Sequence, residues 1–361
     1  MHSIQGARPE GGDDEQPTPD RITADLLIRA RELTGPAHSA AVGGLPEALR
    51  LVAGYSAGWW DADGVPTAAS GKSVRSALAL LCAGAAAAAD PDDAMRAAVP
   101  AAVAVELVHE FSLLHDDVMD GDRTRRHRPA AWTVFGTASA LLTGDALLAL
   151  AFQVLARKSG DTDATRVLAA AVVELCRGQA ADLRFASGRD DPPVGVGDCL
   201  AMIEGKTGSL LAAACELGAR SAGAPPPTAS RYGMFGRELG VAYQLVDDLL
   251  GIRGDPGRTG KPVGADLAAR KLSMPVVAAL RSGTKAGARL ADLYGEPDDL
   301  TEEQILEAAD LVRAAGGTAF AREHARHHTE LALRALADAS PRPSAAADLR
   351  LLADRLIGRD H

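Results

Sequence analysis

Apolar residues recur at intervals of three and four along most of this chain, which is the spacing of amphipathic helices. The pattern starts at Arg21 and predicts helices over residues 21–33, 44–60, 73–89, 93–120, 137–158, 162–187, 196–222, 228–252, 265–282, 302–315, 317–339 and 344–358. Clusters of Gly, Pro and Asp separate these segments. No run of alternating β-branched residues predicts a sheet, so we expect an all-α fold.

Residues 1–20 differ from the rest of the chain because they are rich in Gly, Pro, Asp and Glu and contain almost nothing to bury. We expect a disordered acidic tail there, either inert or able to dock onto another protein. The chemical motifs described below run from Gly71 to Lys271 without an obvious linker or a fixed-period repeat. We therefore expect one helical domain over residues 21–361.

The composition narrows the classes of partner and compartment. A formal charge of -10 argues against nucleic acid as a ligand. The four cysteines are scattered, with no CxxC pair, which is typical of reduced thiols in a cytoplasmic protein. The N-terminus is unlike a signal peptide, and the longest uncharged apolar stretch, residues 77–89, is too short to span a bilayer. We expect a cytoplasmic protein without a membrane span.

Two aspartate clusters each end a strongly apolar helical stretch: Asp116-Asp117-Val118-Met119-Asp120 and Asp247-Asp248-Leu249-Leu250-Gly251. Asp116 and Asp120 are four residues apart and share one helix face. Buried carboxylates cost roughly several kcal/mol each unless they are paired or bind a metal. Hard cations such as Mg²⁺ take oxygen ligands and bridge to phosphates. The two clusters therefore predict a cavity that holds divalent cations and a polyphosphate.

Basic segments accompany the aspartates. The run Arg123-Thr124-Arg125-Arg126-His127-Arg128-Pro129 follows the first cluster, and a Gly/Pro-rich loop carrying Lys261 follows the second, with Lys271 expected one turn into the next helix. Lys72 and Arg75 lie three apart at a predicted helix start, where both side chains and the helix dipole can meet one anion. No aromatic residues interleave with these charges, so phosphate binding is favoured over nucleic-acid binding.

Taken in this order from Ser70 to Lys271, the motifs resemble those of the trans-isoprenyl diphosphate synthases, also called polyprenyl synthetases. The resemblance implies the all-α isoprenoid synthase bundle around a deep central cavity, usually as a homodimer. It implies a prenyltransferase that condenses an allylic diphosphate with isopentenyl diphosphate. It also implies Mg²⁺ as the cofactor, with three ions present when the diphosphate is bound.

The resemblance also assigns roles residue by residue. The metal ligands would be Asp116, Asp117, Asp120, Asp247 and Asp248. The allylic diphosphate would also contact Arg125, Lys206, Thr207, Gln244 and Lys261, with Lys271 in support. The diphosphate of isopentenyl diphosphate would bind Lys72, Arg75, His109 and Arg126. Catalysis would depend on the five aspartates with Arg125, Lys206 and Lys261, and the released diphosphate would accept the final proton.

Three positions depart from the family pattern. Gly251 replaces the third aspartate of the second motif and removes one carboxylate, although Asp255 lies one turn further on. Ser70 replaces the first glycine of the usual G-G-K, and His127 replaces the glycine of R-R-G-x-P. The last two changes leave the anion-binding side chains in place and affect mainly the local backbone.

The residues before the first motif suggest the length of the product. In this family they help to form the cavity floor, and here Phe111 and Ser112 lie five and four residues before Asp116. A bulky residue followed by a small one at these two positions resembles the pattern of synthases that make geranylgeranyl diphosphate (C20). A farnesyl (C15) product and longer products are the alternatives.

Three other functions are compatible with parts of this pattern. A terpene cyclase would share the fold and the first motif but would need no second diphosphate site, against which Lys72, Arg75, His109 and Arg126 argue together. A non-catalytic partner subunit would keep the bundle and lose ligands, and Gly251 is the feature that points to it. An active enzyme docked through residues 1–20 onto a larger assembly is the third.

Overall fold

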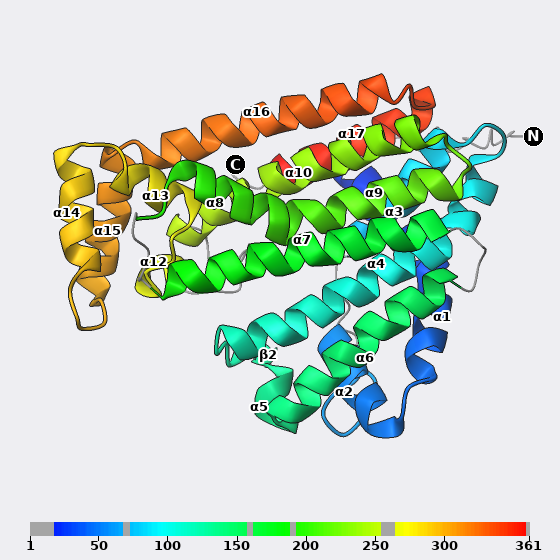
Figure 1. Ribbon diagram of the computed structural model, residues 1–361, viewed down its shortest axis with the longest axis horizontal. Helices are drawn as coiled ribbons and strands as arrows, with labels where there is room; N and C mark the ends of the chain where they lie inside the picture. Colours follow the sequence, from blue (N-terminus) through cyan, green and yellow to red (C-terminus); the bar gives the residue numbers. More distant parts are fainter. Residues whose placement is uncertain (1–17, 68–72, 157–161, 188–192, 254–263, 359–361) are drawn as a thin grey trace, which may run out of the picture.

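The computed structural model describes residues 18–67, 73–156, 162–187, 193–253 and 264–358, and it confirms the all-α fold (Figure 1). The helices are α1 (Pro19–Gly43), α2 (Glu47–Ala57), α3 (Val74–Ala86), α4 (Pro91–Met119), α5 (Ala131–Phe135), α6 (Thr137–Ala156), α7 (Thr162–Ala186), α8 (Val196–Ile203), the π-helical segment η1 (Glu204–Gly208), α9 (Ser209–Ser221), α10 (Pro226–Arg253), α12 (Ala265–Ala268), α13 (Met274–Leu280), α14 (Lys285–Tyr294), α15 (Glu302–Ala314), α16 (Gly317–Asp338) and α17 (Pro343–Ile357). Strands β1 (Thr124–Arg125) and β2 (Arg128–Pro129) form a short antiparallel hairpin.

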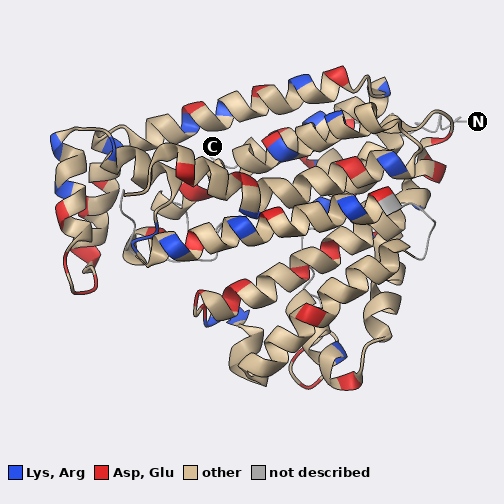
Figure 2. Ribbon diagram, in the orientation of Figure 1, with Lys and Arg blue, Asp and Glu red and all other residues tan. Residues whose placement is uncertain are grey.

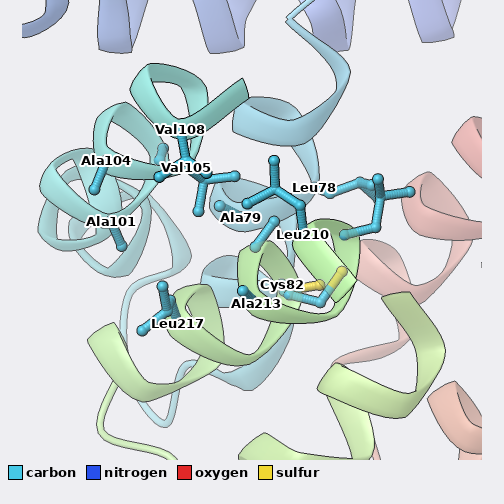
Figure 3. Close-up of a cluster of buried hydrophobic side chains, with 14 of the residues drawn as sticks. Leu78, Ala79, Cys82, Ala101, Ala104, Val105, Val108, Leu210, Ala213 and Leu217 are labelled. Carbon is cyan, nitrogen blue, oxygen red and sulfur yellow. The ribbon is translucent and has the colours of Figure 1, made fainter. Parts of the chain in front are cut away.

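The core lies where α3, α4 and α9 meet, and Figure 3 shows its small and branched side chains in contact. Leu78, Val105 and Leu210, one from each helix, are at most 1% exposed. Burying a leucine side chain fully contributes about 1.5–3 kcal/mol. Because α4 and α10 both pack on α9, this core holds the two helices that carry the aspartate motifs in one fixed arrangement.

Glycines allow three backbones to pack unusually closely beside the second motif. A Cβ added at Gly178 of α7 would lie 2.2 Å from the amide nitrogen of Lys206, and one added at Gly240 of α10 would lie 2.8 Å from the Cα of Gly208. Both contacts are with η1, a single π-helical turn of the kind that often marks functional sites. The sequence pattern predicted one uninterrupted helix over residues 196–222 and did not show this turn.

The ends of α1 and of the 265–282 segment differ from the predictions. Helix α1 continues through Pro36 to Gly43, because Ala30, Thr34, His38 and Val42 form one buried face on both sides of the proline. The predicted 265–282 helix is two helices, α12 and α13, with residues 269–273 between them. Pro275 lies in the first turn of α13, where its missing N–H costs nothing, so a new helix starts there.

Helices α14 and α15 pair at one end of the molecule (Figure 1). The sequence pattern predicted α15 but placed residues 283–301 outside any helix, although α14 begins with a clear cap: Thr284 accepts a hydrogen bond from the amide of Gly287. Helix α5 was also not predicted, because its five residues are too few to show a helical period.

Two of the described helices, α4 and α6, are long and apolar enough to cross a bilayer when only length and composition are considered. Core helices of globular proteins pass the same test. In the most apolar stretch of α4, 67% of the residues are buried, whereas the figure for α6 is 39%. Helix α6 therefore presents an apolar face that the described part of the chain leaves largely uncovered.

Candidate active site

The first aspartate motif lies at the C-terminal end of α4, next to the β1–β2 hairpin, where acidic and basic segments meet in Figure 2. The helix ends at Met119, and Asp120 caps it by donating its amide to the carbonyl of Asp116. Burial raises the pKa of Asp116 to about 6, against the opposing effect of Lys206 and with a further increase from Asp120. A cation placed here would relieve that electrostatic cost.

Arg125 binds the carboxylate of Asp117 directly. Its Nε and one terminal nitrogen lie 2.6 and 2.5 Å from the same oxygen of Asp117, whose side chain is only 5% exposed. A buried charge pair of this geometry is held by short, charge-assisted hydrogen bonds. The residue expected on the allylic diphosphate is thus already oriented by the first motif.

A two-residue turn connects the strands that carry this arginine. The pairing of Arg125 with Arg128 leaves only Arg126 and His127 in the loop, and their φ angles are +49° and +62°. Positive φ at both positions is the signature of a type I′ turn, which favours Asn and Gly. For other residues the left-handed region costs roughly 1–2 kcal/mol. The position where the family has glycine, His127, is one of the two that adopt it.

Lys206 connects the first motif to α7. Its Nζ lies 2.6 Å from Oδ2 of Asp182 and 3.9 Å from Oδ2 of Asp116. The backbone packing of η1 against α7 brings the lysine to these acids. The structure thus places Asp182, to which the sequence prediction assigned no role, among the candidate site residues. Its regular spacing from Gly178 and Gln179 on α7 was the available clue.

The second motif consists of one exposed and one buried carboxylate. Asp247 is exposed, whereas Asp248 is 4% exposed and accepts hydrogen bonds from the side-chain amide of Gln244 and from the backbone amide of Met274, each 3.0 Å long. Thr207 in turn donates to Gln244 over 2.9 Å. Burial raises the pKa of Asp248 to about 6. In this structure Asp248 orders the pocket wall, and its direct binding to a metal stays a prediction.

The space beside Gly251 is filled by another acid. A Cβ added at Gly251 would lie 2.1 Å from Oδ2 of Asp266 on α12. Burial lowers the pKa of Lys271, and the charges of Asp266 and Asp248 outweigh this and raise it above the usual value. Lys271 lies in the non-helical segment before α13, not inside a helix as the sequence pattern predicted. The carboxylate absent from position 251 is thus replaced nearby by one from α12.

A single pocket joins these groups. It is lined by Asp182, Met202, Ile203, Lys206, Thr207, Gln244, Asp248, Lys271 and Ser273. Lys206 extends from this pocket toward Asp116, and the charge of Lys271 acts on Asp120, so the cations that line the pocket beside the second motif also act on the first. The described residues contain no ready-made group of three His, Cys, Asp or Glu ligands. Carboxylate oxygens completed by water and diphosphate oxygens fit Mg²⁺, which usually keeps several such ligands.

Beside the first motif is a group of cations with little local compensation. Burial and the charges of Arg75 and Arg126 lower the pKa of His109 well below its usual value. The buried Nε of Arg75 has no hydrogen-bond partner. Glu106, which accepts a hydrogen bond from Ser76 over 2.7 Å, is the acid whose charge acts on Arg75. The arrangement can accept an anion without a metal.

Three further observations complete the comparison with the sequence. Lys72 and Lys261, both expected at diphosphates, lie outside the described residues. Phe111 and Ser112 are 7% and 8% exposed on α4, and the ring of Phe111 packs edge to face against His115 with 61° between the ring planes. Gln179 is buried with neither amide atom hydrogen-bonded, and sequence reasoning gave it no role.

Comparisons with known proteins agree with this geometry. The polyprenyl synthetase family matches residues 65–312. The chain is 45% identical to a geranylgeranyl diphosphate synthase of Mycobacterium tuberculosis, covering 91% of this chain and 93% of the relative. It is 42% identical to a (2E,6E)-farnesyl diphosphate synthase of Mycobacterium bovis, covering 99% of each. The crystal structure of a polyprenyl synthetase from Streptomyces coelicolor A3(2) superposes with a TM-score of 0.87 at 43% identity, covering 93% of this chain and 99% of that one. The chain therefore belongs to the polyprenyl synthetase family and is a prenyl diphosphate synthase, a transferase of prenyl groups.

Proposed function

We propose that this enzyme condenses an allylic diphosphate with isopentenyl diphosphate and releases geranylgeranyl diphosphate as its main product. The observation that carries the proposal is the presence of two different anion environments. One is the pocket with aspartates and Lys206, which suits a metal-bound diphosphate. The other is the pair of cations Arg75 and Arg126 beside the neutral imidazole of His109, in which the buried Nε of Arg75 has no hydrogen-bond partner among the described residues. A cyclase would need only the first.

In this proposal Asp116, Asp117 and Asp120 would hold Mg²⁺ together with Asp247 and Asp248, and Asp248 also orients the pocket wall. When bound, the metal supplies positive charge that stabilises the departing diphosphate. Lys206 and Arg125 add fixed positive charge at the same place, and Thr207 and Gln244 line it with polar groups. Lys261 and Lys271 are proposed as further cations on this diphosphate.

The reaction itself follows from this charge arrangement. The allylic carbon–oxygen bond breaks, and the oxygen keeps the electron pair as part of the diphosphate. The double bond of isopentenyl diphosphate attacks the resulting cation, and a proton leaves to the released diphosphate. Arg75, His109, Arg126 and Lys72 would hold the second diphosphate throughout. The apolar side chains of Met202 and Ile203, which line the pocket, would help to exclude water that would quench the cation.

We propose the C20 product because Phe111 and Ser112 offer one bulky and one small side chain below the first motif. The geranylgeranyl and farnesyl synthases among the relatives support a short product and leave both lengths in play. We further propose that the enzyme is a homodimer, because α6 has an apolar face with Leu142 at 59% and nearby Val134 at 39% exposure.

The test is product analysis with and without isopentenyl diphosphate. The enzyme, Mg²⁺ and geranyl or farnesyl diphosphate should give a longer prenyl diphosphate only when isopentenyl diphosphate is present. Asp116→Asn should reduce the rate by at least about 100-fold, because it removes a carboxylate from the transition-state environment. Asp299→Asn, at an exposed position, is the matched control and should keep the activity. Product formed from the allylic substrate alone would contradict the proposal and favour a cyclase.

The stability of Asp116→Asn separates a local effect from misfolding. Because burial raises the pKa of Asp116, the ionised carboxylate destabilises the metal-free protein, and its neutral amide should preserve or raise the melting temperature. A rate loss with an unchanged or higher melting temperature supports the proposed role. A rate loss that merely follows unfolding would contradict it.

A further inference from the structure

The type I′ turn presents two neighbouring arginines to two different sets of residues. Arg125 binds Asp117 in the first aspartate motif, while the charge of Arg126 acts on Arg75 and His109. Under the proposed function, one arginine serves each diphosphate. The backbone conformation at residues 126 and 127 therefore sets how the two substrates lie relative to each other.

Arg128 and Tyr55 hold this turn from the side opposite Asp117. The guanidinium of Arg128 lies over the ring of Tyr55, 4.3 Å from its centroid. It also donates to the backbone carbonyls of Tyr55, over 3.3 Å, and Trp60, over 2.9 Å. The hydroxyl of Tyr55 returns a 2.8 Å hydrogen bond to the carbonyl of Pro129. Four interactions thus connect β2 to the end of α2 and the residues that follow it.

Tyr55 is itself well fixed. It is 6% exposed, and the ring of Phe135 packs against it edge to face at 5.2 Å. Trp60 is anchored by a 2.8 Å hydrogen bond from its indole N–H to the carbonyl of Leu51. Arg128 therefore binds to rigid partners, and its own position in β2 fixes one end of the turn.

The turn needs such support because a positive φ is uncommon for residues other than glycine, and here two consecutive residues, Arg126 and His127, adopt it. A backbone in a sparsely populated region persists only where its surroundings determine it. The Asp117–Arg125 pair fixes the β1 end, and the Tyr55–Arg128 contacts fix the β2 end. A pocket bordered by Tyr55, Asp117, Arg125, Arg126 and Arg128 lies between them.

We propose that Tyr55 and Arg128 are positioning residues that hold this turn and thereby set the separation of the two diphosphate-binding arginines. The proposal rests on the proposed function. Neither residue needs to touch a substrate, because each acts through the backbone of residues 125–129. Losing them should affect the binding of both substrates and the rate of their reaction, since small displacements of reacting groups lower rates steeply.

The main test compares Arg128→Ala with Arg342→Ala. Arg342 is a matched control, because it also donates to two backbone carbonyls, those of Ala87 and Ala89, but it lies at the start of α17. Steady-state kinetics are measured for both substrates, below the melting temperature of each variant. Arg128→Ala should raise both KM values and lower kcat, each on the order of tenfold. Arg342→Ala should lower the melting temperature and leave the kinetic constants unchanged.

Two further variants test the mechanism of the effect. Tyr55→Phe keeps the ring under Arg128 and loses the hydrogen bond to Pro129, so its kinetic loss should be smaller than that of Arg128→Ala. His127→Gly adopts a positive φ readily and should restore part of the KM increase when added to Arg128→Ala. A merely structural role for Arg128 would give no such rescue of KM.

The outcomes separate this inference from the proposed function. If wild-type protein forms no elongated product, the proposed function fails first. If wild-type protein is active while Arg128→Ala keeps wild-type kcat and both KM values, the positioning role is overturned and the function stands. Equal kinetic losses in Arg128→Ala and Arg342→Ala would also overturn it, because the effect would then be one of general stability.

Discussion

Asp266 lies 15 positions after Gly251 in the sequence, and in the fold its side chain occupies the space next to Gly251. The carboxylate of Asp266 lies where a side chain at 251 would begin, and it acts on both Lys271 and Asp248. The second motif therefore keeps its local negative charge although it has lost an aspartate. A Cβ at position 251 would displace the Asp266 carboxylate from its present place.

A substitution at Ser112 would show how strongly a single residue controls the chain length of the product. It lies four residues before Asp116 on the same helix, and therefore on the same face as the first motif. Its hydroxyl donates to the carbonyl of His109, within its own turn of α4. Ser112→Phe would fill the space beneath the allylic chain and should shorten the main product from C20 toward C15, which chromatography of the products would show.

Ser112→Ala is the control for this change, because it removes only the local hydrogen bond and should leave the product length unchanged. An unchanged product from Ser112→Phe, in a variant that retains activity, would remove Ser112 from the cavity floor. The proposed condensation would be unaffected by that result.

The sequence predicted the residue types of the site better than their contacts. Asp116, Asp117 and Asp248 were recognisable as candidate site residues, because paired carboxylates at the end of an apolar helical stretch are costly unless they bind a cation. Their different surroundings were not predictable, since Asp117 is paired by an arginine of the hairpin, whereas Asp248 accepts hydrogen bonds from Gln244 of its own helix and from Met274 of α13. Asp182 lies on a helix whose pattern is otherwise ordinary, so only the fold brings it to the pocket.

At the scale of elements, hydrophobic periodicity predicted the long helices. It did not predict the features that depend on packing between helices, namely the π-helical turn and the continuation of α1 through Pro36. Helices α3, α4, α6, α7 and α16 all lie within predicted segments to within a few residues. The π-helical turn η1 lies where α7 and α10 approach each other closely. The hydrophobic pattern of a single segment contains no information about this contact between helices, so the turn was not predicted. Helix α1 crosses Pro36 because its buried face continues, and this burial overrides the local signal to stop.

The attachment of α1 to α4 should depend on pH. His38 and Glu110 form a buried pair with 3.3 Å between Nε2 and Oε2, and the edge of His38 packs against Trp59. Burial lowers the pKa of His38, but the charge and hydrogen bond of Glu110, with a contribution from Glu106, outweigh it and raise the pKa above 6.5. A histidine with a raised folded pKa stabilises the protein fully below pH 6.5, and this stabilisation is lost as the pH rises through the folded value.

His38→Gln should therefore flatten the decline of stability above pH 6.5. Urea unfolding midpoints of wild type and variant between pH 6 and 9, in the presence of a chelator, would measure this decline of stability with pH. His327→Gln, which changes an exposed histidine on α16, is the control and should keep the wild-type slope. An identical slope in wild type and His38→Gln would show that this pair does not govern the pH dependence.

At the scale of the whole molecule, the uncovered face of α6 is the feature that a single chain does not explain. Helix α4 buries most of its apolar stretch against α3, α6 and α9, whereas α6 leaves Leu142 59% exposed. Each square ångström of apolar surface removed from water contributes roughly 25 cal/mol, so covering this face by a second copy is favourable. The proposed homodimer places that surface at a two-fold interface, where one patch meets its equivalent.

Leu142→Lys should convert the dimer into a monomer, because it would bring two like charges into an apolar contact near the two-fold axis. Leu306→Lys is the matched control, since Leu306 is 58% exposed on α15, in the pair of helices at one end of the molecule. Light scattering coupled to size-exclusion chromatography would give the mass of each variant. A wild-type monomer would rule out the homodimer. Dimers in both variants would show that Leu142 does not lie in the dimer interface. The apolar face of α6 would then need a different occupant.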